Sequence, residues 1–249
     1  MLRVLIIGFF ILVNSLYGNT INIAIAANVS YATKKLVEEF NKQYSQTKVK
    51  VTFGSSGKLT AQIKHGAPYH IFMSANMRYP QTLYKEKIAI DKPVIYANGA
   101  LVFLSANVQN FTLGMHLLED EKIKRVAIAN PKTAPYGKAT LEALHRSATY
   151  TKVRKKLVFA ESASSVVTYA ITAADIGIVP KSILFSAKMS RYKEGVNWST
   201  LDSTLYTPIH QGIVLLKRGS KNEEARNFYK FILSAKAKEI FKDYGYTTP

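Results

Sequence analysis

The sequence predicts an α/β protein built mainly from parallel sheets. Short apolar segments with the alternation or the length of strands recur along the 249 residues, and most precede segments whose apolar residues have helical spacing. No internal repeat, low-complexity segment or linker rich in proline, glycine and serine interrupts this order. If the chain forms two lobes, continuous strands must therefore join them.

The first part of the chain predicts three strands and three helices. Apolar residues alternate or cluster, as in strands, at residues 21–25, 49–53 and 71–73. Helices are expected at 31–44, from about 59 to 65, and at 80–87. Ser30 should cap the first helix, residues 54–57 should form a turn, and Gly66 should end the second helix.

The second part continues the same alternation. Strands are expected at residues 101–104, 126–129, 176–179 and 213–216. Helices are expected at 138–146, at 163–172 with Ser162 as its cap, and over most of 222–241. Residues 130–137 should form a loop between a strand and a helix.

The beginning of the chain has the composition of a secretory signal peptide. One positive charge, at Arg3, precedes an apolar run over 4–13 and a short segment that ends at Gly18. We expect residues 1–18 to be removed on export; a buried strand and an uncleaved anchor are the alternatives. The chain contains no cysteine, which excludes disulfides and the usual lipid-modified cysteine.

The formal net charge of +18 raises nucleic acid and anionic membranes as partners. The charge is dispersed, however, and the basic clusters at 122–125 and 152–156 lack interleaved aromatic residues. We therefore predict a solvated basic surface that steers anions and no nucleic-acid partner. A basic adhesion protein, for which the charge itself is the function, remains an alternative.

Motifs for catalysis or metal binding are missing. None of the five histidines has the spacing of a metal-binding pair. Residues 54–60 do not match the spacing of a phosphate-binding loop or of a nucleophile elbow. The only suggestive carboxylate is Glu161, for which a charge partner near a helix start is the simpler role. The sequence therefore predicts no enzyme, with an exported phosphate-ester hydrolase as the alternative from another class.

Small polar residues occupy four turns that lead into predicted helices. The four turns are 26–30, 53–57, 134–137 and 161–164. A helix start exposes unpaired N–H donors and a partial positive charge, so it binds anions without a charged side chain. One such turn indicates only an ordinary cap, whereas four in one α/β chain favour a ligand site at the carboxyl ends of strands.

An ordered set of segments resembles the periplasmic molybdate-binding proteins of molybdate ABC transporters. The set extends from residue 21 to residue 247, and its members are 26–28, 53–59, 62–68, 72–76, 129–137, 175–177 and 241–246. The resemblance implies a two-lobed, type II-like periplasmic binding protein fold in which crossover strands join the lobes. The implied lobes are residues 19–98 plus 206–249, and residues 99–205.

The resemblance also implies the function and the site. The protein would be a periplasmic monomer that closes around molybdate or tungstate and delivers it to a membrane permease. Asn28 and Ser56 would donate from the first lobe, whereas Tyr136 and Ala163 would donate main-chain N–H groups from the second. No cofactor is implied, and molybdenum would be bound only as the oxyanion, without direct metal ligands.

Three positions depart from the pattern of the family. Some members have a tyrosine donor where this chain has Pro180, although Asn28 and Tyr136 match another branch. Asn76 stands where an aspartate is common. Residues 186–203 match poorly, so they carry no predicted role.

Oxyanion chemistry agrees with such a donor-only site. Molybdate, tungstate and sulfate are dianions at neutral pH and offer only acceptors, whereas a protonated phosphate needs an acceptor such as a carboxylate. No aspartate lies in the four turns. Sulfate, phosphate or another oxyanion remains the alternative ligand, because a sequence does not report the size of a pocket.

Overall fold

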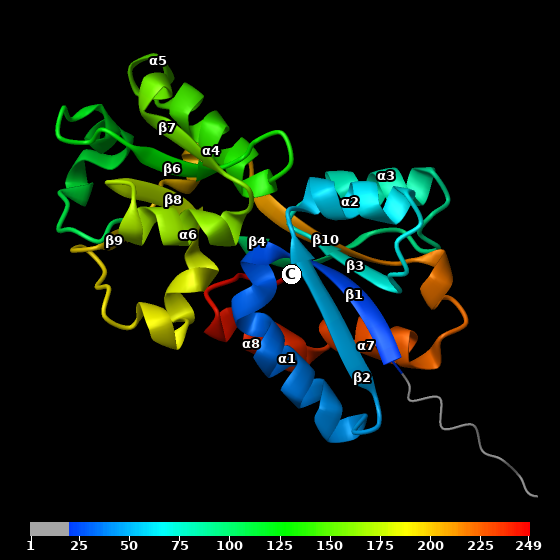
Figure 1. Ribbon diagram of the computed structural model, residues 1–249. Coiled ribbons are helices and arrows are strands. Elements are labelled where there is room, and N and C mark those ends of the chain that lie inside the picture. Colours follow the sequence, from blue (N-terminus) through cyan, green and yellow to red (C-terminus); the bar gives the residue numbers. More distant parts are fainter. Residues whose placement is uncertain (1–19) are drawn as a thin grey trace, which may run out of the picture.

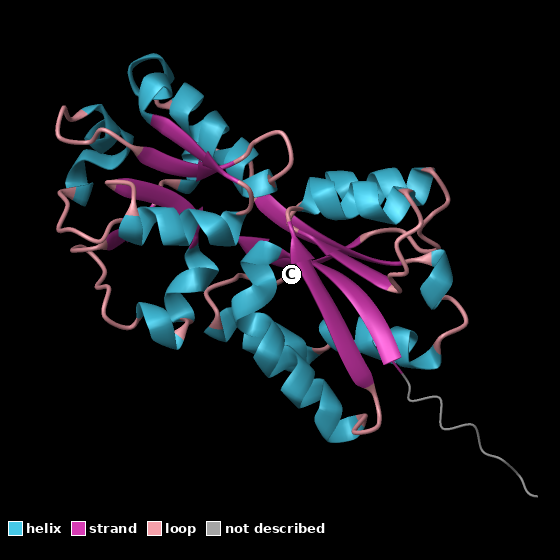
Figure 2. Cartoon of the chain, viewed as in Figure 1, coloured by secondary structure: helices cyan, strands magenta, loops and turns pink. Residues whose placement is uncertain are grey.

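The computed structural model describes residues 20–249, which form two lobes (Figure 1). The predicted signal peptide lies outside the described residues. Each lobe contains a five-stranded sheet with helices on both faces (Figure 2). Within residues 20–249, no helix is long and apolar enough to cross a membrane.

The first sheet has the strand order β2-β1-β3-β10-β4. Its strands are β1 (Thr20–Ala26), β2 (Lys48–Gly54), β3 (Ile71–Ser74), β4 (Val94–Gly99) and β10 (Ile209–Leu215). Strands β2, β1 and β3 are parallel, and β10 is antiparallel to both of its neighbours. Four strands therefore share one direction, and only β10 is reversed.

The second sheet repeats this plan with the order β7-β6-β8-β5-β9. Its strands are β5 (Leu101–Leu104), β6 (Val126–Ala129), β7 (Leu157–Ala160), β8 (Ile176–Pro180) and β9 (Trp198–Thr200). Here β5 is the reversed strand. The mixed α/β architecture confirms the predicted fold class, and within residues 20–249 each sheet has one reversed strand, β10 or β5.

The chain passes between the sheets twice. Only Ala100 separates β4 from β5, so the first passage is an almost continuous strand. The return from β9 to β10 contains a short 3-10 turn, η6 (Ser203–Leu205). The exact lobe boundaries stay a prediction.

Helices cover both faces of the first sheet. The helices of this lobe are α1 (Ser30–Gln43), α2 (Ser56–Lys64), α3 (Arg78–Lys85), α7 (Glu223–Ile232) and α8 (Ala235–Asp243). Ile23 and Ile25 pack with Phe40 of α1 and Phe228 of α7. Ala24, between them in the sequence, packs on the opposite face with the α2 and α3 side chains.

The second lobe is covered in the same way. Its helices are α4 (Pro135–Arg146), α5 (Tyr150–Val153) and α6 (Ala163–Thr172). Ile128 of β6 packs with residues of α4, whereas Ala127 packs with Val166 of α6. The remaining 3-10 helices of the molecule are η1 (Ala27–Val29), η2 (Phe111–Glu119), η3 (Arg154–Lys156), η4 (Lys181–Phe185), η5 (Ala187–Met189) and η7 (Lys217–Gly219).

Several predicted boundaries differ from the structure. The long C-terminal helix is two helices, because Ser234 begins a new one by accepting the N–H of Ala237. Helix α4 begins at Pro135 and shortens the predicted loop, since proline suits the first helical position. Helix α2 begins at Ser56 rather than near Leu59. Ser30 is the first residue of α1 and not its cap.

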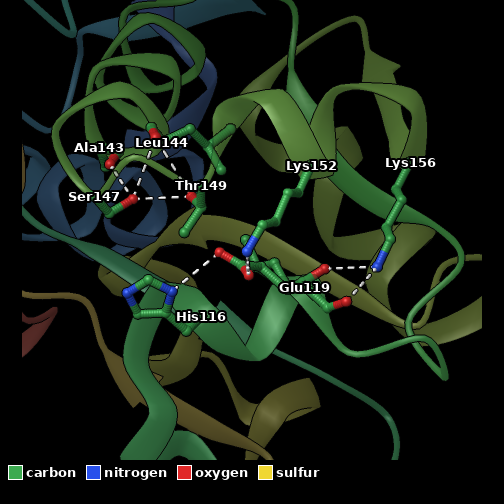
Figure 3. Close-up of polar contacts among 9 residues, drawn as sticks. His116, Glu119, Ala143, Leu144, Ser147, Thr149, Lys152 and Lys156 are labelled. Carbon is green, nitrogen blue, oxygen red and sulfur yellow. Dashed lines mark hydrogen bonds and ion pairs between the residues drawn. The ribbon is translucent and has the colours of Figure 1, made fainter.

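Two cations of the second basic cluster are engaged inside the second lobe. The Lys156 ammonium donates to the main-chain oxygens of Leu118, Glu119 and Asp120, and Lys152 pairs with Glu119 at 2.6 Å (Figure 3). Residues 152 and 156 precede β7, at the opposite end of the parallel strands from the polar turns. Part of the positive charge of the basic cluster at 152–156 therefore stabilises contacts within the second lobe.

Candidate functional site

The four polar turns lie at the carboxyl ends of parallel strands, where the two lobes meet. The turn after β1 leads into η1, and the turn after β2 leads into α2. In the second lobe, β6 and β7 lead into α4 and α6. Neighbouring parallel strands end at the same edge of a sheet, so each lobe presents two helix starts side by side.

Contacts between the lobes connect these turns directly. The Gly57 N–H donates to the Thr133 oxygen at 2.9 Å. Lys58 pairs with Glu161 at 2.7 Å. On the η1 side, the Ser182 hydroxyl of η4 donates to the Asn28 carbonyl oxygen at 2.9 Å. The helix starts of one lobe therefore face those of the other.

Three buried main-chain donors remain unpaired at these helix starts. Ser56, Tyr136 and Ala163 lie in the first turns of α2, α4 and α6 and are only 1%, 2% and 6% exposed. First-turn N–H groups have no partner within their own helix. Among residues 20–249, no other group accepts from these three N–H groups.

The Ser56 side chain adds a fourth donor. Its hydroxyl oxygen accepts the N–H of Ala75 at 3.0 Å, which fixes the position of that oxygen. The described residues contain no acceptor for the hydroxyl proton. A hydroxyl that already accepts one hydrogen bond can still donate another, so Ser56 can offer both its N–H and its O–H to one acceptor.

Asn28 lies at the same place, but its side chain is occupied. The amide nitrogen donates to the Gln211 side-chain oxygen at 2.8 Å and to the Tyr246 hydroxyl at 3.0 Å. An amide NH₂ has two protons, and both are used. The Asn28 side chain therefore supports the site in this structure, and its donation to an anion stays a prediction. The main-chain N–H of Asn28 in η1 is a second donor at this position.

A buried polar network below Asn28 includes residues that sequence reasoning missed. Gln211 is fully buried on β10, next to a register shift in its pairing with β4. Its side chain accepts from Tyr96 at 2.9 Å and donates to Tyr136 at 3.3 Å. The Tyr246 hydroxyl donates to the Asn28 carbonyl oxygen at 2.9 Å. A glutamine directly before the apolar run of β10 was the available signal.

Burial keeps the tyrosines of this network neutral. It raises the pKa of Tyr246 to about 12, and the pKa values of Tyr96 and Tyr136 rise well above their ordinary value for the same reason. The hydroxyl groups therefore stay protonated at neutral pH. The network joins the lobes without adding a negative charge near the unpaired donors.

The charged groups at the turns include an exposed ion pair, Lys58 with Glu161. The carboxyl of Glu161 is exposed, and its hydrogen bond with Lys58 lowers its pKa. A general acid would need a raised pKa instead. Within the described part of the chain, no group of three or more His, Cys, Asp or Glu side chains could hold a metal ion.

The positions that departed from the family pattern have structural roles. Pro180 ends β8, and Ser182 two residues later makes the contact with Asn28. The Asn76 side chain accepts the N–H of Tyr79 at 3.3 Å, near the start of α3. The segment 186–203 contains η5 and β9, and β9 completes the second sheet.

Comparisons with known proteins agree with this architecture. The family model of the bacterial extracellular solute-binding proteins matches residues 21–247. The molybdate-binding protein ModA of Rhodobacter capsulatus is 34% identical, over 90% of this chain and 87% of the relative. That of Azotobacter vinelandii is 32% identical, over 91% and 89%. The solved structure of the Azotobacter vinelandii periplasmic molybdate-binding protein has a TM-score of 0.84 at 30% identity, over 92% of this chain and 99% of that one. The chain therefore belongs to the family of bacterial extracellular solute-binding proteins.

Proposed function

We propose that this protein captures molybdate, and also tungstate, between its lobes and delivers it to the permease of an ABC transporter. The observation that carries the proposal is the set of unpaired, buried N–H groups of Ser56, Tyr136 and Ala163, which come from both lobes. The two ModA relatives, which cover most of the chain, are molybdate-binding proteins by name.

The chemistry of the donors supports a fully deprotonated oxyanion. Helix starts supply N–H groups and partial positive charge, and the Ser56 hydroxyl adds a proton. Glu161, the only carboxylate in the four turns, already pairs with Lys58. A protonated phosphate would leave its own O–H without an acceptor, and that loss disfavours it in a buried site.

The remaining parts of the proposal rest on the composition of the sequence and on the family to which the chain belongs. The anion is held by hydrogen bonds alone, with no cofactor and no protein ligand to molybdenum. The protein acts as an exported, monomeric binding protein in the periplasm and not as an enzyme. The lobes comprise residues 19–98 plus 206–249, and residues 99–205.

Binding and lobe closure are coupled in this proposal. Asn28 and Ser56 belong to one lobe, and Tyr136 and Ala163 belong to the other. A tetrahedral anion is small, so it contacts both sets only when the lobes are together. The anion therefore selects the closed state, which the contacts Gly57–Thr133 and Lys58–Glu161 also favour.

Molybdate and tungstate should raise the melting temperature of residues 19–249, and phosphate should not. A ligand that binds only the native state, at about a hundredfold above its dissociation constant, adds about 2.7 kcal/mol to the free energy of unfolding. A thermal-shift screen with molybdate, tungstate, sulfate and phosphate measures this. Equal shifts with phosphate and molybdate would contradict the donor-only site.

Ser56→Ala should weaken molybdate binding roughly ten- to a hundredfold, since a hydrogen bond to a charged group contributes about 1.5–3 kcal/mol. Lys58→Ala is the control from the next position. It removes an exposed ion pair, which contributes little, and should mainly slow association. Calorimetric titration and stopped-flow kinetics distinguish the two effects. Abolished binding in Lys58→Ala together with unchanged binding in Ser56→Ala would indicate a charge-paired site instead.

Gly57→Ala should weaken binding without destabilising the ligand-free protein. An added Cβ would lie 2.7 Å from the hydroxyl of Tyr79 in the same lobe, which is the far end of a side chain that can shift, and 3.0 Å from the main-chain oxygen of Thr133 in the other lobe. Closure would therefore be strained by about 1–3 kcal/mol, and the affinity would fall roughly ten- to a hundredfold. Alanine is also the better helix former, so the free energy of unfolding without ligand should not decrease. Chemical denaturation and calorimetry measure the two quantities. A parallel loss of both would mean that the glycine serves folding and not closure.

A further inference from the structure

Helix α2 has a capping serine that does not cap. Ser55 precedes α2 with φ −68° and ψ 144°, the extended conformation that N-cap residues adopt. Its side chain makes no capping hydrogen bond. The Ser55 hydroxyl oxygen is buried, and it has no hydrogen-bond partner among the residues that the structure describes.

Other helices of the same chain show what such residues do when nothing interferes. Ser162, Asn222 and Ser234 are also extended N-cap residues, and each accepts the main-chain N–H three residues later. Ser186, which precedes the three-residue 3-10 helix η5, is extended and makes no capping bond either, so the comparison holds for α-helices. The difference at Ser55 must come from its surroundings.

The other lobe supplies a substitute cap for α2. The Gly57 N–H, two residues after Ser55, donates to the Thr133 main-chain oxygen at 2.9 Å. An N-cap oxygen normally bonds the N–H of the second or third helical residue, which here are Gly57 and Lys58. The Thr133 carbonyl oxygen therefore takes one of the two N–H groups that a capping serine oxygen would bond, and two acceptors that share one N–H repel each other.

We propose that Ser55 caps α2 when the lobes are apart and that the Thr133 carbonyl replaces it on closure. Ser55 is thus an affinity-determining residue that acts through the lobe equilibrium and does not contact the anion. This inference rests on the proposed function, in which an anion brings the lobes together. In addition, the loss of the Ser55 cap opposes closure, and this loss occurs at the start of α2, where the anion is proposed to bind.

The direction of the effect follows from the exchange of caps. Capping by Ser55 stabilises only the open state, since in the closed state its hydroxyl makes no hydrogen bond with the described residues. Loss of the hydroxyl therefore raises the closed fraction of the ligand-free protein. Because ligand binds only the closed state, its apparent dissociation constant falls as that fraction rises. One N-cap corresponds to about a fivefold change in the closed-to-open ratio.

The test measures the lobe equilibrium of residues 19–249 in the absence of ligand. The chain has no cysteine, so Lys85→Cys in α3 and Lys155→Cys in η3, both exposed, accept spin labels only at those two sites. Distances between the labels report open and closed populations. Adding Ser55→Ala should increase the closed-to-open ratio about fivefold and, in calorimetry with molybdate, lower the dissociation constant by up to the same factor.

Ser234→Ala is the matched control. This serine caps α8, which packs on the opposite face of the first sheet from α2, and its hydroxyl oxygen accepts the N–H of Ala237. It should lower the melting temperature and leave the closed fraction unchanged. An unchanged or smaller closed fraction in Ser55→Ala would overturn the proposal. Weaker molybdate binding by Ser55→Ala would also overturn it and would make Ser55 a direct donor. The label distances need no ligand, so they decide the role of Ser55 even if molybdate fails to bind.

Discussion

The constraint on which the rest of the structure depends is the burial of helix starts that cannot satisfy their own N–H groups. Each lobe places the ends of parallel strands at one edge, and the chain turns there into helices. Bringing two such edges together buries the donors of Ser56, Tyr136 and Ala163. Buried donors without acceptors are costly, so the closed arrangement is favourable only with an acceptor between the lobes.

The reversed strand β10 supports the facing helix starts through the hydrogen bonds of a buried side chain. Gln211, at its irregular pairing with β4, contacts Tyr96 and Asn28 of the first lobe and Tyr136 of the second. Glutamine has both donors and an acceptor, so it can join tyrosine hydroxyls to the Asn28 amide without any charge. The network therefore positions the turn after β1 and leaves the partial positive charge of the helix starts uncompensated.

Local patterns in the sequence predict the strands that are apolar and the turns that are rich in serine, glycine and asparagine. They miss β4, which includes the polar Asn98, β7 (Leu157–Ala160), which has only four residues, and β9, which has only three. The positions of the four turns were predictable because strand ends and helix starts are local features. The partners of Asn28 were not, since Gln211 and Tyr246 are 183 and 218 residues away along the chain. The sequence also does not show that the Gly57 N–H, at the start of α2, bonds to Thr133 of the other lobe.

The central claim is that main-chain N–H groups from both lobes bind one oxyanion, and nuclear magnetic resonance of the amide protons tests it most directly. Titration of ¹⁵N-labelled protein with molybdate should shift the amide protons of Ser56, Tyr136 and Ala163 strongly downfield, as expected for new hydrogen bonds to a charged acceptor. The shifts should saturate together, because one anion contacts both lobes. Saturable binding that leaves these three amide protons unchanged, or that shifts those of one lobe only, would contradict the account.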